Sequence, residues 1–207
     1  MNILVIGAAG RTGKLVVDQA LSAGHTITAF VHTEEDYDAP ARVATFQGDV
    51  LNLESVTEAM QQQDAVIDTL GGHLPWRETT LETNGARNVL AAMHAVNVRR
   101  LVICSTLGEG DSTSNVHPWY EHLIMPTLLR GVMRDKAGME DVVSHSDLDW
   151  VIVRPAGLTD GDHKPVRIIT PESNEKVRFI TRADLASFLL AQLTSDQYLR
   201  QTVGIAN

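Results

Sequence analysis

Three glycines near the start of the chain have a spacing that suits phosphate binding. Gly7, Gly10 and Gly13 directly follow the apolar run Ile3–Ile6 and precede residues whose apolar members recur at helical spacing. A dinucleotide pyrophosphate needs close backbone approach, free N–H groups and the positive end of a helix dipole, and glycine removes the side chains that would block that approach. Tight strand-to-helix turns also use glycine for steric reasons alone. Because a strand precedes this turn and a helix follows it, we predict that it binds a dinucleotide.

The elements that must position this turn alternate between strand and helix. Apolar runs predict strands at residues 3–6, 26–31, 43–46, 65–70, 101–104 and 150–153, and helical spacing predicts helices at 14–21, 53–61, 85–96 and 136–146. This alternation predicts one α/β domain over residues 1–207, a Rossmann-type doubly wound parallel sheet.

Two irregular segments interrupt the alternation, at residues 107–135 and 156–181. Both follow strands, so we expect them at the sheet edge where such folds bind ligands, as substrate-side insertions. The second contains strand-like pieces at 166–169 and 177–180. Thr181 and Asp184 then form a capping pair that predicts the start of the last helix.

Composition limits the possible partners and compartment. The chain has 207 residues, 43% of them hydrophobic, and a formal net charge of -9 with no long basic run, which argues against nucleic acid as a partner. No apolar run is long enough to span a bilayer, so no membrane partner is expected. Cys104 is the single cysteine, which fits a reducing compartment, and we expect a cytoplasmic protein. The histidines show no metal-ligand spacing, so no metal site is expected.

Several short motifs together resemble those of one enzyme family. They are residues 7–13, 47–50, 64–67, 85–88, 104–106 and 181–185. In this order they are similar to the atypical short-chain dehydrogenase/reductases of the NAD(P)H-binding, NmrA-like group, and within it to the biliverdin reductase B (flavin reductase) type. The similarity covers essentially the whole chain, and it implies an NADP cofactor, with NAD possible.

The resemblance also implies which residues contact the cofactor. The pyrophosphate and ribose phosphate would be held by Gly7, Ala9, Gly10, Arg11, Thr12 and Gly13. The adenine would lie between Asp49 and Val50, and its ribose above Leu70, Gly71 and Gly72. The residues beside the nicotinamide would be Arg154, Pro155, Ala156 and Gly157. Structural alternatives stay open for three of these places: a turn aspartate for Asp49, a simple turn for the glycine pair, and an ion-pair partner for Arg154.

The chain departs from the larger dehydrogenase family at one catalytic position. That family uses Ser or Thr together with Tyr-x-x-x-Lys, in which the tyrosine donates a proton and the lysine lowers its pKa. Thr106 and Lys136 match the first and last of these residues, but Val132 stands where the tyrosine is expected. Tyr120 is followed four residues later by Ile124, so it does not replace it. Thr106 could instead cap backbone at a strand end, and Lys136 could be a solvated helix lysine.

The missing tyrosine argues against a carbonyl reductase or epimerase that uses Thr106 and Lys136. It favours an NADPH-dependent reductase whose small-molecule substrate is a planar conjugated acceptor, such as a flavin, quinone or linear tetrapyrrole. Such acceptors delocalise the incoming charge, and water can supply the proton. A non-catalytic dinucleotide sensor with a protein partner also fits the resemblance. Both alternatives need the same turn, so the sequence leaves them open.

The end of the second strand predicts the choice of cofactor. NAD-preferring sites usually place a carboxylate there to hold the ribose hydroxyls, but this chain has His32. Arg11 can still reach a 2′-phosphate with its planar guanidinium. We therefore expect NADPH to bind more tightly than NADH, and Arg11→Ala to reduce that preference. Titration with both dinucleotides checks this, and similar dissociation constants, or an unchanged preference in the variant, would contradict it.

Overall fold

The computed structural model describes the chain except residues 34–36, 72–78, 109, 116–128 and 174. In these described ranges a mostly parallel eight-stranded sheet has the order β3-β2-β1-β4-β5-β6-β10-β8. Its strands are β1 (Asn2–Ile6), β2 (Thr26–Val31), β3 (Val43–Gln47), β4 (Ala65–Asp68), β5 (Arg100–Cys104), β6 (Asp149–Pro155), β8 (Arg167–Ile169) and β10 (Gln201–Ala206). The order reverses between β1 and β4, which is the switch point where open α/β sheets bind ligands. The predicted Rossmann-type fold is confirmed.

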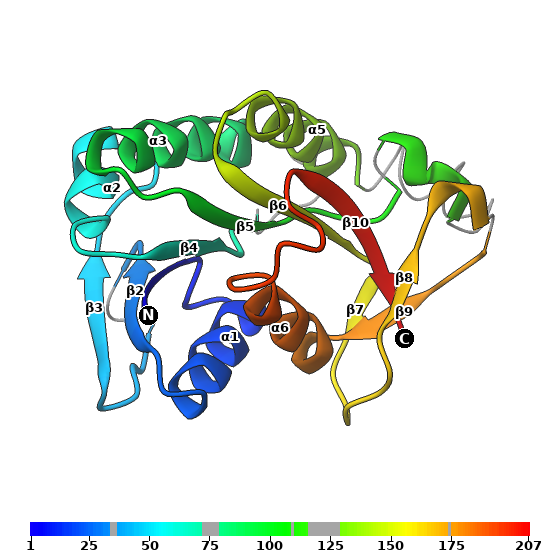
Figure 1. Ribbon diagram of the computed structural model, residues 1–207, viewed down its shortest axis with the longest axis horizontal. Coiled ribbons are helices and arrows are strands. Elements are labelled where there is room, and N and C mark those ends of the chain that lie inside the picture. Colours follow the sequence, from blue (N-terminus) through cyan, green and yellow to red (C-terminus); the bar gives the residue numbers. More distant parts are fainter. Residues whose placement is uncertain (34–36, 72–78, 109, 116–128, 174) are drawn as a thin grey trace.

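Helices cover both faces of this sheet (Figure 1). One face carries α1 (Arg11–Ser22) and α6 (Arg182–Ala191), and the other carries α2 (Leu53–Ala59), α3 (Leu81–Val96) and α5 (Arg130–Ser144). Alternate residues of a strand point to opposite faces, so Ile3 and Val5 of β1 join the core under α1 and α6, whereas Leu4 and Ile6 join the core under α2, α3 and α5. A central strand of this kind is apolar throughout because both of its faces are buried.

Helix α1 begins three residues before the predicted start, and two further helices begin at least four residues early. Helix α3 begins at Leu81 rather than at Gly85 because a side chain from α5 caps it. The Asp135 carboxylate accepts hydrogen bonds from the backbone N–H groups of Glu82, at 3.0 Å, and Thr83, at 2.8 Å. The other such helix, α5, begins at Arg130 rather than at Lys136.

Strand β10 is absent from the sequence prediction. It pairs parallel with β6 and antiparallel with β8, so the sheet is not parallel throughout. Gly204 interrupts its apolar pattern, and a Cβ atom at that position would lie 2.7 Å from the carbonyl oxygen of Ile169. The glycine that hides this strand in the sequence is therefore what allows β8 to approach it.

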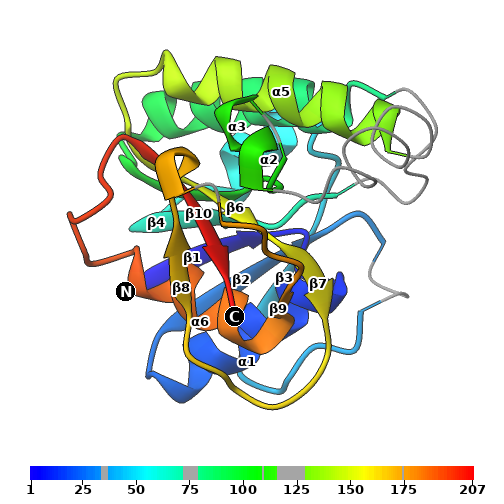
Figure 2. The same ribbon diagram turned by 90° about the vertical axis from the view of Figure 1, so that its right-hand side faces the viewer.

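The 156–181 insertion is tied to the body of the domain by the Asp184 carboxylate. Its strands β7 (Gly157–Thr159) and β9 (Phe179–Thr181) form a second, two-stranded parallel sheet, seen at the right of Figure 2. As expected, the Thr181 hydroxyl caps α6 by accepting from the N–H of Asp184. Burial raises the pKa of Asp184, but hydrogen bonds from Thr181, His163, the N–H of Lys164 and Asn207 outweigh burial and lower it. The carboxylate thus stays ionised and holds loop, helix and terminal strand together.

Candidate cofactor-binding and active site

The turn after β1 lies directly against the end of β4. Gly7 has a φ of +75°, and a Cβ atom there would come within 3.0 Å of the backbone of Thr69 and Leu70. At Gly13 an added Cβ would lie 2.2 Å from the carbonyl oxygen of Gly7, a separation that requires the backbone to move. Both glycines are therefore needed for the packing of the chain itself. The steric explanation of this motif holds, and its binding of a dinucleotide stays a prediction.

The first turn of α1 has the properties of an anion site. Gly10 is its N-cap residue, and as a glycine it has no side chain with which to cap this end of the helix. The first N–H groups of any α-helix lack intrahelical partners, and the helix dipole places positive potential on them. These N–H groups lie beside the switch point between β1 and β4. The arrangement fits the pyrophosphate of a dinucleotide, as the sequence predicts.

The predicted adenine contacts are held by α3. The Asn88 amide donates to the carbonyl oxygen of Val50 at 2.9 Å, and Gly85 leaves the space that the Val50 side chain needs. The Asp49 carboxylate accepts from the N–H of Leu51 at 2.9 Å, so Asp49 has the role of a turn aspartate, and its side chain remains exposed. His32 follows β2 and is exposed as well. Gly72 lies outside the described residues, and Gly71 is exposed.

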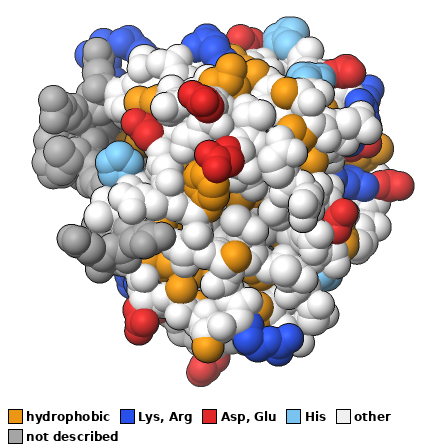
Figure 3. Space-filling model, turned by 90° about the vertical axis from the view of Figure 1, so that its left-hand side faces the viewer, with side chains coloured by type: hydrophobic (Ala, Val, Ile, Leu, Met, Phe, Trp, Pro, Cys, Tyr) orange, Lys and Arg blue, Asp and Glu red, His pale blue; other side chains and the backbone are white. Residues whose placement is uncertain are grey.

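The side of the molecule at the β3 end of the sheet shows how charge is distributed near this adenine region. Lysine and arginine side chains there are dispersed among acidic and uncharged ones (Figure 3). A phosphate backbone is bound by clustered basic side chains, and the described side chains that are visible on this face form no such cluster. That nucleic acid is no partner stays a prediction.

Thr106 lies between the ends of β5 and β6. The N–H of Ser105 donates to the carbonyl oxygen of Val153 at 2.7 Å, and the N–H of Leu107 donates to that of Pro155 at 2.9 Å. Thr106 is thus beside the segment predicted to flank the nicotinamide. Its hydroxyl is 3.5 Å from the carbonyl oxygen of Leu107, which is too long for a strong hydrogen bond. The hydroxyl can therefore bond to a ligand at this edge.

Lys136 is buried beneath the end of β5, so the alternative that it is a solvated helix lysine is wrong. Its side chain is 10% exposed, and its Nζ atom lies 2.5 Å from Oε2 of Glu82. The same Nζ atom donates to the carbonyl oxygen of Cys104 at 3.2 Å. A lone buried ammonium would be strongly destabilising, and the Glu82 carboxylate provides the charge that makes burial possible. The amine and the Thr106 hydroxyl thus come together around the end of one strand.

Burial and neighbouring charges shift the pKa values in this cluster. Burial raises the pKa of Asp68 to about 6 against the lowering effect of the Leu70 N–H, and the Glu82 carboxylate adds to the rise. Burial is the largest single effect on Lys136 and would lower its pKa, but the charge and hydrogen bond of Glu82, together with the charges of Cys104 and Asp68, outweigh burial and raise the pKa. Burial also raises the pKa of the Cys104 thiol to about 11. At neutral pH the cluster therefore contains a fixed cation and a protonated thiol.

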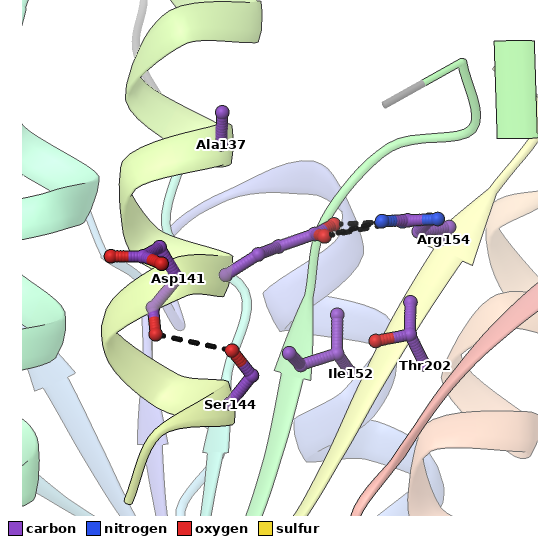
Figure 4. Close-up of a pocket in the computed structure, with 7 residues that line it drawn as sticks. Ala137, Asp141, Ser144, Ile152, Arg154 and Thr202 are labelled. Carbon is purple, nitrogen blue, oxygen red and sulfur yellow. Dashed lines mark hydrogen bonds and ion pairs between the residues drawn. The ribbon is translucent and has the colours of Figure 1, made fainter. Parts of the chain in front are cut away.

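Arg154 forms the structural ion pair that the sequence leaves open as an alternative. Its guanidinium contacts the Glu140 carboxylate, with an Nη2 to Oε2 distance of 2.6 Å, and both side chains are buried. The pair lies in a pocket of about 290 Å³ between α5, β6 and β10, also lined by Ala137, Asp141, Ser144, Ile152 and Thr202 (Figure 4). The Arg154 side chain thus points over the sheet toward α5. Only the backbone of Pro155, Ala156 and Gly157 continues along the ligand-binding edge.

Several residues of this site were not found by sequence reasoning. Asp68 had a local signal, because it is a carboxylate at the end of a strand that is otherwise apolar. Glu82, Glu140 and Asp160, the ion-pair partners of Lys136, Arg154 and Arg11, had none, since each meets its partner only in the folded chain. Residues 116–128 of the predicted substrate-side insertion at 107–135 lie outside the described residues.

Comparison with known proteins decides the family. A family described as NAD(P)H-binding matches residues 7–196. The chain belongs to this NAD(P)H-binding family. It is 26% identical to the photosystem II assembly factor Ycf39 of Trieres chinensis over 93% of this chain and 60% of that protein.

Solved structures share the fold at lower identity. ChuY of Escherichia coli O157:H7, named an anaerobilin reductase, superimposes with a TM-score of 0.81 at 22% identity, covering 100% of this chain and 97% of the other. A short-chain dehydrogenase/reductase of Veillonella parvula, in complex with NADP, has a TM-score of 0.80 at 16% identity, with 100% and 94% covered. Both share the Rossmann-type fold of this chain.

Two further properties concern the described part of the chain only. Within it, no cluster of three or more His, Cys, Asp or Glu side chains could hold a metal ion. Every helix in these ranges is too short or too polar to cross a bilayer.

The raised pKa of Asp68 predicts a pH-dependent gain from Asp68→Asn. A folded-state pKa of about 6, above the ordinary 3.8, favours folding fully below pH 3.8, and this contribution is lost as pH rises through 6. Asparagine removes the buried charge and still accepts from Leu70. We expect the free energy of unfolding to rise by up to about 3 kcal/mol at pH 8 and by much less at pH 4.5. Urea titrations of both proteins, with the exposed Asp38→Asn as control, measure the difference. A difference that does not change with pH would contradict the assignment.

Gly71 allows the cofactor position to be tested without disturbing the fold. No atom of the described residues lies within 4 Å of a Cβ built there. We expect Gly71→Ala to leave the free energy of unfolding within about 0.5 kcal/mol of wild type, and to weaken NADPH binding about tenfold if the ribose lies above this residue. Gly13→Ala should lower both stability and binding. Isothermal titration and thermal unfolding separate the two effects, and unchanged NADPH affinity in Gly71→Ala would place the ribose elsewhere.

Proposed function

We propose that this protein is an NADPH-dependent reductase that transfers a hydride to a planar conjugated acceptor, such as a flavin, a quinone or a linear tetrapyrrole. The observation that carries the proposal is the composition of the site at the end of β5. A hydroxyl and a buried ammonium lie there, and Val132 stands one helical turn before Lys136 on α5. The described tyrosines, Tyr37 and Tyr198, pack on the opposite face with α1 and α6. No described tyrosine can therefore donate a proton at this site.

The residues present fit a bound nicotinamide dinucleotide. The uncapped first turn of α1 would bind the pyrophosphate, and the Thr106 hydroxyl and the backbone after Pro155 would orient the nicotinamide end. Bound NADPH would supply the hydride. Lys136 keeps its proton because Glu82 raises its pKa, so it would act as a fixed positive charge near the reacting groups rather than as an acid.

Orientation would be the main contribution of the protein to the rate. Holding the nicotinamide and the flat acceptor face to face makes the hydride transfer effectively unimolecular, which removes much of the entropic part of the activation barrier. The acceptor gains two electrons with the hydride, and water supplies the proton that completes its reduction. A small aldehyde or ketone would develop a localised alkoxide charge that this site does not stabilise with a strong donor.

Support for NADP over NAD comes from one residue that follows β2 and one residue in the glycine turn. His32 is exposed at the end of β2 in place of a carboxylate, and Arg11 begins α1 beside the predicted phosphate site. The structural neighbour from Veillonella parvula is in complex with NADP.

A second candidate function is a dinucleotide sensor that acts through a protein partner. The name of the relative from Trieres chinensis, a photosystem II assembly factor, favours it, because that name describes assembly rather than turnover. A sensor would use the same turn and would need no acceptor site.

A substrate panel tests the proposal. Purified protein is mixed with saturating NADPH and with FMN, menadione, biliverdin or small carbonyl compounds, and NADPH oxidation is followed at 340 nm, the wavelength of its absorbance. We expect turnover with the flat acceptors and little with the carbonyls. Thr106→Val should lower kcat by roughly tenfold with an unchanged NADPH dissociation constant, and Thr106→Ser should retain activity. Turnover limited to carbonyls would overturn the proposed chemistry, and NADPH binding without any turnover would favour the sensor.

A further inference from the structure

One carboxylate joins two arginines across the mouth of the glycine turn. Asp160 follows β7, and its Oδ1 atom accepts from Nη1 of Arg182 at 2.8 Å. Its Oδ2 atom pairs with Nη2 of Arg11. Arg11 is the first residue of α1 and Arg182 is the first residue of α6. These two helices lie side by side on the same face of the sheet (Figure 1).

The charges around this contact leave it with an excess of positive charge. Two guanidinium groups share a single carboxylate, and the nearest acid on α6, Asp184, is occupied by Thr181, His163, the N–H of Lys164 and Asn207. The uncapped first turn of α1 adds positive potential from its N–H groups. An oxygen anion is therefore the group that these arginines are suited to bind, and a phosphate offers more acceptor atoms to them than a carboxylate does.

We propose that Asp160 is an internal competitor of the cofactor: in the dinucleotide-free protein its carboxylate occupies the place between Arg11 and Arg182 that a phosphate group of the dinucleotide takes on binding. The inference rests on the proposed use of this turn by a dinucleotide. It adds that the Asp160 carboxylate occupies the phosphate position, and that this competition lowers the affinity for the dinucleotide. Arg11 and Arg182 change partner when the phosphate enters, and Asp160 is released to solvent.

Because the contact between Arg11 and Asp160 is exposed, opening it costs little free energy. The side chains of Arg11 and Asp160 are 69% and 62% exposed, whereas that of Arg182 is 14% exposed. An exposed ion pair contributes little to stability because water solvates both partners when it opens. Arg11 and Asp160 can therefore separate readily, while the more buried Arg182 keeps its position. Asp160 belongs to the segment that begins at Gly157, so its release also frees the chain beside the predicted nicotinamide position.

The experiment compares Asp160→Asn with a matched charge removal. Asp162→Asn removes an exposed carboxylate only two residues away, and thus reports the general electrostatic gain for any anionic ligand. Dissociation constants for NADPH, ADP and 2′,5′-ADP are measured by isothermal titration at fixed salt. We expect Asp160→Asn to bind NADPH about three- to tenfold more tightly than wild type, and Asp162→Asn to stay within twofold. In an Arg11→Gln, Arg182→Gln background the Asp160→Asn gain should disappear.

The nucleotide fragments identify the phosphate. A gain for both ADP and 2′,5′-ADP assigns the contact to the phosphates at the 5′ end, and a gain for 2′,5′-ADP alone assigns it to the 2′-phosphate; either result supports the proposal. Equal or weaker NADPH binding in Asp160→Asn, or a gain that persists without the two arginines, would overturn it. Wild-type binding with no reductase turnover would count against the proposed reductase alone, since the Asp160 effect is measured by binding.

Discussion

A helix that begins one turn after a buried strand can lie against that strand only where side chains are absent at the meeting of the two backbones. In this chain the constraint acts between Gly7 and Gly13, where a single added carbon at Gly13 would lie 2.2 Å from a carbonyl oxygen. The position of α1, and with it the packing of α6 beside α1, follows from that contact. The same close approach leaves the first turn of α1 open, and its N–H groups could bind phosphate.

On the face of the sheet that carries α2, α3 and α5, buried charged side chains determine how the helices pack. Asp135 of α5 caps α3, and Lys136, the next residue of α5, pairs with Glu82 of α3. Consecutive residues of one helix thus fix both the start of its neighbour and the amine beneath β5. Because breaking a buried pair leaves an uncompensated charge, these contacts specify how the two helices pack as well as stabilising them. The chemistry of the site and the packing of this layer depend on the same side chains.

The strands β1 to β6 could be predicted because a buried parallel strand is visible as a local apolar run, as in Ile3–Ile6. The glycine turn and Thr106 could be placed for the same reason, since both directly follow such strands. The burial of Lys136 and the turn of Arg154 toward α5 could not, because each depends on an acid 54 or 14 residues away in the chain. Strand β10 was missed because Gly204 interrupts its apolar pattern. The reason for that glycine is the close approach of β8, which pairs with β10 in the fold but lies more than thirty residues earlier in the sequence.

The place of β10 has a consequence for the order in which the domain is completed during synthesis. Residues 201–206 lie between β6 and β8, so the outer edge of β6 and the inner edge of β8 have no strand to pair with until these residues have left the ribosome. Until then both are open edges of the kind that invites pairing with other chains. Strand β10, which follows the other seven described strands of this sheet along the chain, thus removes both open edges when it inserts between β6 and β8.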